Sequence, residues 1–195
     1  MTLRVIAGKY KGRSLKTPKT TSTRPTQGML REAVFNICQN EVAEAFFLDL
    51  FAGSGAMGFE AISRGAAKAT LVEQNRQALL CIKENIEALK IGSEVELLPM
   101  DAHRAIQVLA KKKALFNIVY IDPPYNTPVK DFLDPLPSLL APDALIFVEE
   151  RSSPKSISKP YESPSLILKD SRRFGVALLH QYRFFPIIKK KLGQT

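Results

Sequence analysis

Asp122, Pro123, Pro124 and Tyr125 form a tetrapeptide directly behind the apolar run 115–121. The run predicts a buried strand that ends at the tetrapeptide. Two consecutive prolines fix the backbone and remove two N–H donors, so the predicted loop is rigid and its carbonyls are free to accept hydrogen bonds. A carboxylate, a fixed carbonyl and an aromatic ring together suit a planar base that carries an exocyclic amine. Taken alone, the tetrapeptide is equally compatible with a surface turn.

A glycine-rich segment follows an earlier buried-strand pattern at 46–51. Gly53, Gly55 and Gly58 match the spacing G-x-G-x-x-G, which permits a tight strand-to-helix turn and lets a ligand approach the backbone. Glu73 ends the next apolar strand, where an acidic residue is placed to bind the hydroxyls of a ribose. These residues predict a nucleotide-like cofactor, although glycine turns and exposed carboxylates also occur for purely structural reasons.

Two cofactor classes compete for the glycine segment. A nicotinamide dinucleotide would use the same glycines and the same acid. Asp49 favours S-adenosylmethionine, because an acid just before the loop would repel a pyrophosphate and would pair with a cationic amino or sulfonium group. Asp122 favours it further, since hydride transfer has no obvious use for an Asp-Pro-Pro-Tyr loop that faces the cofactor.

The segment 49–55, together with the 122–125 loop, resembles the Rossmann-like methyltransferases that use S-adenosylmethionine to modify exocyclic amines. The chain from Arg4 to about Tyr182 resembles the RsmD family, whose members methylate the N2 atom of a guanine in bacterial small-subunit ribosomal RNA. The stretches that carry this resemblance are 4–8, 11–13, 24–26 and 31–36. The chain departs from the family pattern at 27–29, which reads Gln-Gly-Met, and at 174–175, which reads Phe-Gly where the family tends to have Tyr-Gly.

The resemblance implies a cofactor site built from strand ends. Glu73 would bind the ribose, Asp101 and Ala102 the adenine amine, and the 53–55 loop the methionine portion. An acid before Ala102 would also cap a helix, so both roles stay open for Asp101. The implied cofactor-binding residues are Asp49, Phe51, Gly53, Ser54, Gly55, Gly58, Glu73, Asp101, Ala102 and Asp122.

The chemistry that these residues suggest depends on positioning. The lone pair of the guanine N2 atom is delocalised into the ring, which makes the amine a poor nucleophile. If Asp122 and the Pro123 carbonyl accept hydrogen bonds from its two N–H groups, the nitrogen can become pyramidal and direct its lone pair toward the methyl donor. Tyr125 would stack on the flipped base. The predicted catalytic residues are Asp122, Pro123, Pro124 and Tyr125.

Charge is distributed unevenly along the chain, whose net charge is +9. Residues 1–31 carry +8 with no acid, residues 32–150 carry −7, and residues 151–195 carry +8. A basic arm beside an acidic body is the pattern expected of binding to a phosphate backbone, although basic termini can also serve solubility. The residues predicted to bind RNA are Arg4, Lys9, Tyr10, Lys11, Arg13, Arg24 and Arg31.

Apolar periodicity predicts alternating strands and helices, hence an α/β Rossmann-like sheet of seven mostly parallel strands with an antiparallel C-terminal hairpin. Residues 1–26 are predicted to form a basic hairpin arm and linker, and residues 27–195 the methyltransferase domain. The predicted strands are 3–7, 14–16, 46–51, 68–73, 94–98, 115–121, 144–149, 165–169 and 176–184. The predicted helices are 27–39, one after Gly58, one through 82–89, 102–111 and 130–140.

Composition argues against a membrane protein, a secreted protein and a metal-dependent enzyme. No run approaches the roughly 18 apolar residues of a membrane helix, and the first residues lack a signal-peptide core. Cys38 and Cys81 fall in helical apolar patterns, which indicates reduced cysteines and a cytoplasmic location, and the histidines His103 and His180 lack metal-ligand spacing. We expect a monomer that acts on small-subunit ribosomal RNA or the assembling 30S subunit. A methyltransferase for DNA adenine N6 or for a protein glutamine amide, and a non-catalytic RNA-binding assembly factor, stay open as alternatives.

Overall fold

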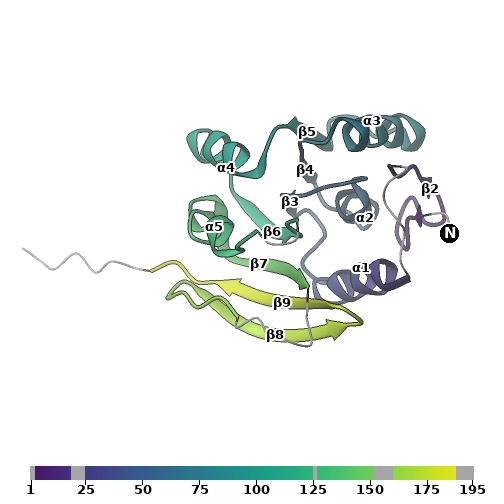
Figure 1. Ribbon diagram of the computed structural model, residues 1–195. Coiled ribbons are helices and arrows are strands. Elements are labelled where there is room, and N and C mark those ends of the chain that lie inside the picture. The colour runs from purple at the N-terminus through teal and green to yellow at the C-terminus, as the bar shows by residue number, and fades with distance from the viewer. Residues whose placement is uncertain (1–2, 19–24, 125–126, 152–159, 188–195) are drawn as a thin grey trace, which may run out of the picture.

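The computed structural model describes residues 3–18, 25–124, 127–151 and 160–187. Within these residues, seven strands form one sheet in the order β5-β4-β3-β6-β7-β9-β8 (Figure 1). The first five strands in this order pair in parallel, and β9 and β8 pair antiparallel beyond β7, as predicted. The strands are β3 (Phe46–Asp49), β4 (Lys68–Glu73), β5 (Val95–Pro99), β6 (Phe116–Ile121), β7 (Leu140–Arg151), β8 (Leu166–Phe174) and β9 (Ala177–Phe184).

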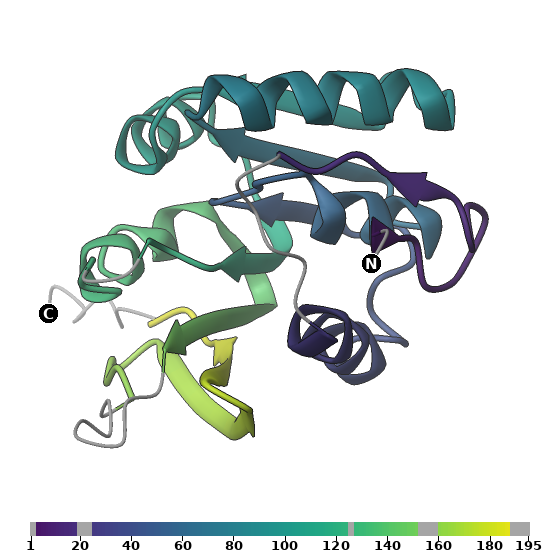
Figure 2. The ribbon, with the colours of Figure 1, turned by 45° about the vertical axis from the view of Figure 1, so that its right-hand side comes forward.

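Helices cover both faces of the sheet, as a sheet of parallel strands requires (Figure 2). Side chains of α1, α2 and α3 share one hydrophobic cluster with the sheet, and side chains of α4, α5 and the 3₁₀ helix η1 share the other. The predicted helix 130–140 is two short helices, because a proline interrupts it and β7 begins four residues earlier than expected. The helices are α1 (Pro25–Ile37), α2 (Ala56–Ser63), α3 (Arg76–Leu89), α4 (Ala102–Lys111), α5 (Lys130–Leu133) and η1 (Leu136–Leu139).

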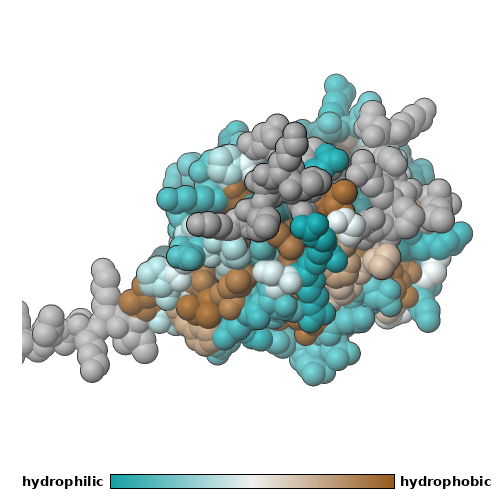
Figure 3. All heavy atoms as spheres, turned by 60° about the horizontal axis from the view of Figure 1, so that its bottom comes forward, coloured by the Kyte–Doolittle hydropathy of each residue, from teal (hydrophilic) through white to brown (hydrophobic). Residues whose placement is uncertain are grey.

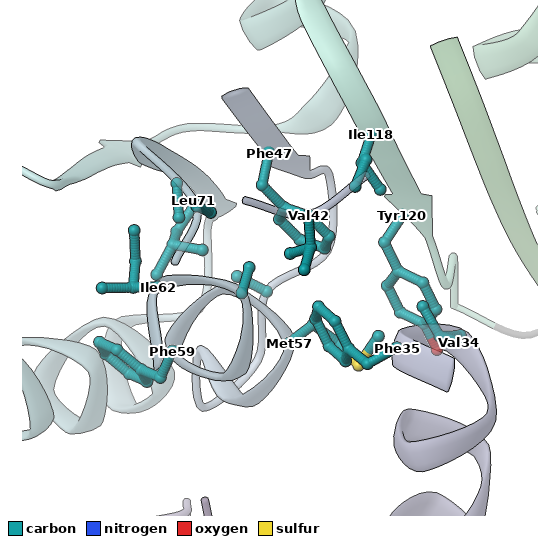
Figure 4. Packing of buried hydrophobic residues seen from close by; sticks show 14 of the residues in the cluster. Val34, Phe35, Val42, Phe47, Met57, Phe59, Ile62, Leu71, Ile118 and Tyr120 are labelled. Atoms are coloured by element: carbon teal, nitrogen blue, oxygen red, sulfur yellow. The ribbon is translucent and has the colours of Figure 1, made fainter. Parts of the chain in front are cut away.

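Helix α1 covers the middle of the sheet on the face that it shares with α2. Phe35 of α1 and Phe47 of β3 stack with their ring centroids 5.9 Å apart, and Figure 4 shows Val34 of α1 beside Tyr120 of β6. Tyr120 is 4 % exposed, so its ring is part of the core, while its hydroxyl donates a hydrogen bond to Glu149 near the end of β7. None of the helices that the structure describes is long and apolar enough to span a membrane.

The N-terminal arm is a small hairpin of β1 (Leu3–Arg4) and β2 (Ser14–Leu15) that is docked on α2. A completely buried carboxylate, that of Glu60, holds it in place. This carboxylate accepts the backbone N–H of Ile6 at 2.7 Å and of Ala7 at 3.0 Å. Arg64 Nε donates to it at 2.8 Å, and Arg31 Nε lies 3.7 Å away. The two guanidinium groups compensate the buried charge, so the arm is part of the core structure.

The end of α2 makes a second set of contacts with the arm. Ser63 accepts the N–H of Lys9 on its carbonyl at 2.7 Å and the N–H of Tyr10 on its hydroxyl at 2.9 Å. A Cβ on Gly8 would lie 1.8 Å from the Ser63 carbonyl oxygen, so only glycine allows this approach.

Two residues predicted to bind RNA lie inside this docked arrangement. Tyr10 is 8 % exposed and packs in the hydrophobic cluster, so its ring has no open face for a base. Arg31 is 4 % exposed and donates to the Arg4 carbonyl at 2.6 Å as well as facing Glu60. The structure therefore disagrees with an RNA contact at either residue and gives both a role in docking the arm. Isolated sequence motifs could not reveal this, because the partner residues lie on a different element.

We predict that Glu60→Ala destabilises the protein by about 3–5 kcal/mol, because it leaves Arg31 and two backbone N–H groups buried without their acceptor. Urea unfolding measures the loss, and limited proteolysis reports whether the arm is released. Glu87→Ala, at an exposed position on α3, is the matched control and should change the free energy of unfolding by less than about 0.5 kcal/mol. A similar small change for Glu60→Ala would contradict the anchoring role.

Candidate active site

A cavity of about 300 Å³ opens at the carboxyl ends of the parallel strands. It draws residues from the ends of β3, β4, β5 and β6 and from the loops that follow them, which is where open α/β sheets bind ligands. Its lining residues are Leu50, Phe51, Gly53, Val72, Glu73, Gln74, Met100, Asp101, Ala102, Asp122, Pro123 and Pro124. The glycine segment and the Asp-Pro-Pro loop, about seventy residues apart in the sequence, thus share one cavity.

Glu73 fixes the glycine loop. Its Oε2 accepts the N–H of Gly53 at 2.8 Å, and its Oε1 accepts the N–H groups of Gln74 at 2.8 Å and Asn75 at 2.7 Å. Gly53 has φ +54°, and a Cβ there would meet nothing within 4 Å, so open space lies beside its Cα. Glu73 therefore holds the loop and faces the cavity at the same time, with lone pairs left for hydroxyl donors.

The other glycines of the motif serve packing. A Cβ on Gly55 would lie 2.6 Å from the Phe59 ring, and a Cβ on Gly58 would lie 2.3 Å from Leu71 Cδ2. Neither glycine lines the cavity, and Ser54 does not line it either. The Ser54 carbonyl accepts a hydrogen bond from Asn85 at 3.2 Å. These three predicted cofactor residues shape the loop from behind.

Asp101 combines both of the roles that the sequence leaves open. Its Oδ1 accepts the N–H of Arg104 at 3.0 Å and caps α4, and the residue also lines the cavity beside Ala102. Aromatic rings stack next to this point: Phe51 meets Phe132 edge-on at 5.0 Å. The imidazole of His103 also stacks on Phe132, with the ring centroids 4.6 Å apart. Phe132 and His103 were not predicted, because their meeting depends on α4 and α5 sharing one face of the sheet.

Asp49 ends β3 beside β6, in register with Tyr120, and only 1 % of it is exposed. Its carboxyl accepts the N–H of Phe51 at 3.2 Å. Burial raises the pKa of Asp49 to about 7, and the negative charge of Glu73 contributes in the same direction. Because burial disfavours the negative charge of this carboxyl, a cation that binds nearby would stabilise its ionised form strongly.

Asp122 follows β6 and faces the cavity. The protein atoms around its carboxyl desolvate it and, together with the charges of Glu149 and Asp49, raise its pKa well above the ordinary range. Glu149, on β7, accepts a hydrogen bond from the Tyr120 hydroxyl at 2.5 Å. Glu149 ends the predicted strand 144–149 and has no predicted role, since nothing within a single strand indicates which residue lies beside it on the neighbouring strand. An acid at the end of the strand adjoining the Asp-Pro-Pro loop was the available signal.

The basic residues of the arm lie away from the cavity, near the C-terminal ends of α2 and α3 and so toward the amino ends of the strands. Arg13 donates to the Ala88 carbonyl near the C-terminal end of α3 at 2.5 Å, and Lys9 lies over the Tyr10 ring at 5.1 Å. Arg4, Lys9, Lys11 and Arg13 are all exposed. Arg24 and Tyr125, also predicted site residues, fall outside the described residues. Within the described part of the chain, no group of three or more His, Cys, Asp or Glu side chains could hold a metal ion.

The strand order, the antiparallel hairpin and the cavity between the glycine turn and the Asp-Pro-Pro loop define a Rossmann-like methyltransferase. A family model described as "Conserved hypothetical protein 95" matches residues 3–183. The chain belongs to this family, the RsmD family.

Relatives and solved structures agree with this assignment. The chain is 38 % identical over 153 residues to Ribosomal RNA small subunit methyltransferase D of Escherichia coli, covering 75 % of this chain and 74 % of the relative. The structure of yhhF from Escherichia coli has a TM-score of 0.81 at 32 % identity and covers 95 % of this chain and 99 % of its own. SMU.776, solved with SAH bound, shares the fold with a TM-score of 0.66 at 16 % identity over 83 % of this chain and 50 % of its own. The predicted fold, methyltransferase class and S-adenosylmethionine cofactor are confirmed.

We predict that Asp49→Asn makes the protein more stable than wild type above pH 7. The wild-type carboxyl has a folded pKa of about 7 against an ordinary 3.8, so the folded state holds the extra proton and loses stability as pH rises between these values. Asparagine keeps the acceptor for the Phe51 N–H without ionising. We expect a gain on the order of 2–4 kcal/mol at pH 8 that shrinks toward zero at pH 4.

Urea unfolding of both proteins across this pH range measures the difference. Asp131→Asn, at an exposed position in α5, is the control and should differ from wild type by less than about 0.5 kcal/mol. A pH-independent difference for Asp49→Asn would contradict the assignment of the raised pKa to Asp49.

Proposed function

We propose that this protein transfers a methyl group from S-adenosylmethionine to the exocyclic N2 of a guanine in small-subunit ribosomal RNA. The observation that carries the proposal is the shared cavity, in which Asp122 and the Pro123 carbonyl stand beside the glycine loop and its ribose-binding acid. The relatives named as small-subunit ribosomal RNA methyltransferases support RNA as the substrate over DNA or a protein amide.

The residues around the cavity fit S-adenosylmethionine. Glu73 offers carboxylate lone pairs to ribose hydroxyls, and Asp101 with the Ala102 N–H offers an acceptor and a donor to an adenine edge. Leu50, Val72 and Met100 supply apolar walls. Asp49 does not line the cavity, but it directly precedes the lining residue Leu50, so its buried carboxyl can supply negative charge for a cation from behind the wall. When bound, the cofactor supplies a methyl group on a positively charged sulfur, which is an electrophile.

Asp122 and Pro123 act on the amine. The carboxylate and the proline carbonyl accept hydrogen bonds from the two N–H groups of the amine. This geometry turns the lone pair of the nitrogen away from the ring and toward the glycine loop. Prolines at 123 and 124 keep this carbonyl in place, so little reorganisation is needed when the base arrives. Its raised pKa also makes the Asp122 carboxylate a stronger proton acceptor than an exposed aspartate, and it can take the proton that the nitrogen loses.

The arm extends the RNA-binding surface around the molecule. The exposed cations Arg4, Lys9, Lys11 and Arg13 lie at the edge opposite the cavity, and the docked hairpin keeps them at a fixed distance from it. An RNA that contacts both edges must be a folded structure at least as broad as the sheet. This arrangement favours an assembled or assembling small subunit over a short RNA.

We predict that Asp122→Asn lowers methyl transfer to RNA by at least about 100-fold, because asparagine keeps the shape but loses the charged acceptor. Affinity for S-adenosylmethionine, measured by calorimetry, should fall by less than about 10-fold. Labelled methyl transfer to small subunits, naked ribosomal RNA, DNA and protein tests the activity and the substrate class together. Turnover close to that of wild type in Asp122→Asn would rule out the proposed role of this carboxylate.

We predict that the double variant Lys9→Ala, Lys11→Ala binds RNA more weakly. The slope of log K against log salt concentration should become shallower by the equivalent of about one to two phosphate contacts. Affinity for S-adenosylmethionine should stay unchanged, since both lysines lie far from the cavity. Lys111→Ala, at an exposed position at the end of α4, is the matched control. An unchanged salt slope in the double variant would assign the arm a purely structural role.

A further inference from the structure

Glu149 lies beside Asp122, which lines the cavity. Ile121 of β6 pairs with Val148 of β7, so the next positions along these parallel strands are Asp122 and Glu149. Neighbouring strands lie about 4.8 Å apart, and residues in register point to the same face. The two carboxyls are close enough for the negative charge of Glu149 to add to the effect of burial in raising the pKa of Asp122.

Tyr120 fixes the orientation of Glu149. Its hydroxyl donates to Glu149 Oε2 at 2.5 Å, and its ring is held between β6 and α1 (Figure 4). Glu149 itself is half-buried, and this hydrogen bond limits the movement of its carboxylate. The hydrogen bond uses Oε2 and leaves Oε1 as an acceptor for a ligand.

The chemistry of the purines makes this acceptor selective. The edge of guanine that carries the N2 amine also carries the N1–H donor next to it. Adenine presents a lone pair at N1 instead. A carboxylate accepts an N–H donor and repels a lone pair, and a mismatch of this kind at a partly buried site is costly.

We propose that Glu149 is a specificity residue that accepts the N1–H of the target guanine while Asp122 and the Pro123 carbonyl accept the N2 amine. The inference rests on the proposed function, since it assumes a guanine at this site. Asp49, Asp122 and Glu149 leave the cavity edge rich in acceptors, and Tyr120 is the donor that the structure shows beside them. Guanine brings the missing donors on adjacent atoms.

The position of the methylated guanine is first mapped in RNA treated with the wild-type protein. The test then compares RNA that carries guanine at this position with RNA that carries 2-aminopurine there. Both bases carry the N2 amine, but 2-aminopurine has a lone pair at N1. For the wild type we expect kcat/KM to favour guanine by about 10- to 100-fold. In Glu149→Gln, whose amide can also donate, this ratio should fall toward one.

Tyr120→Phe is the matched control, because it keeps the carboxylate and removes only the group that orients it. We expect a smaller loss of discrimination and unchanged affinity for S-adenosylmethionine in calorimetry. If Glu149→Gln does not fold, binding of wild type to RNA with inosine or purine riboside at the target position replaces it. Inosine keeps the N1–H and should bind more tightly by about 10-fold.

Two different failures can be told apart. If wild type methylates no guanine, the proposed function is wrong. If wild type methylates guanine but Glu149→Gln keeps the full preference over 2-aminopurine, or if inosine and purine riboside bind equally, Glu149 does not select the base.

Discussion

The site depends on one constraint, which is that the carboxyl ends of parallel strands meet at the same edge of a sheet and bring their acidic residues together there. Asp49 and Glu73 end their strands, Asp122 follows β6, and Glu149 lies near the end of β7. These strands are neighbours in space, so the negative charges gather in a region partly closed to water. Such a cluster is unfavourable for the folded protein by itself. It becomes favourable when a ligand brings positive charge and N–H donors, which a sulfonium nucleoside and a guanine edge together provide. The protein therefore gives up stability to gain binding at this edge.

The arm shows a different use of buried charge. Glu60 is enclosed, but two guanidinium groups and two backbone N–H groups surround it, so its charge strengthens the structure. The resulting contacts fix the hairpin at the end of α2, and Asn85 joins the backbone of Lys16 to that of Ser54 in the glycine loop. The basic surface and the cofactor loop are consequently parts of one packed unit.

The sequence was sufficient for the fold class, because strand and helix periods alternate strongly and the two C-terminal strands are too close in sequence for a crossover helix. The arrangement of seven strands was what the resemblance to the methyltransferases implied, and the structure supplies the strand order. The sequence also predicted which strand ends would meet, since that is a rule of parallel sheets. It did not predict the burial of Arg31 and Tyr10, because their charge and ring look the same whether they face solvent or Glu60 and the core. Glu149 had no recognisable motif, and only the register of β6 and β7 places it beside Asp122.

The glycine motif has a consequence for how such patterns are interpreted. Gly55 and Gly58 are required because Phe59 and Leu71 occupy the space where a side chain would begin, and this would hold in a chain that bound no ligand. Two of the three invariants of the pattern thus report how closely a helix approaches a strand. This explains why the spacing alone could not distinguish a dinucleotide from a methyl donor. The discriminating information lies in the acids around the turn, which the pattern omits.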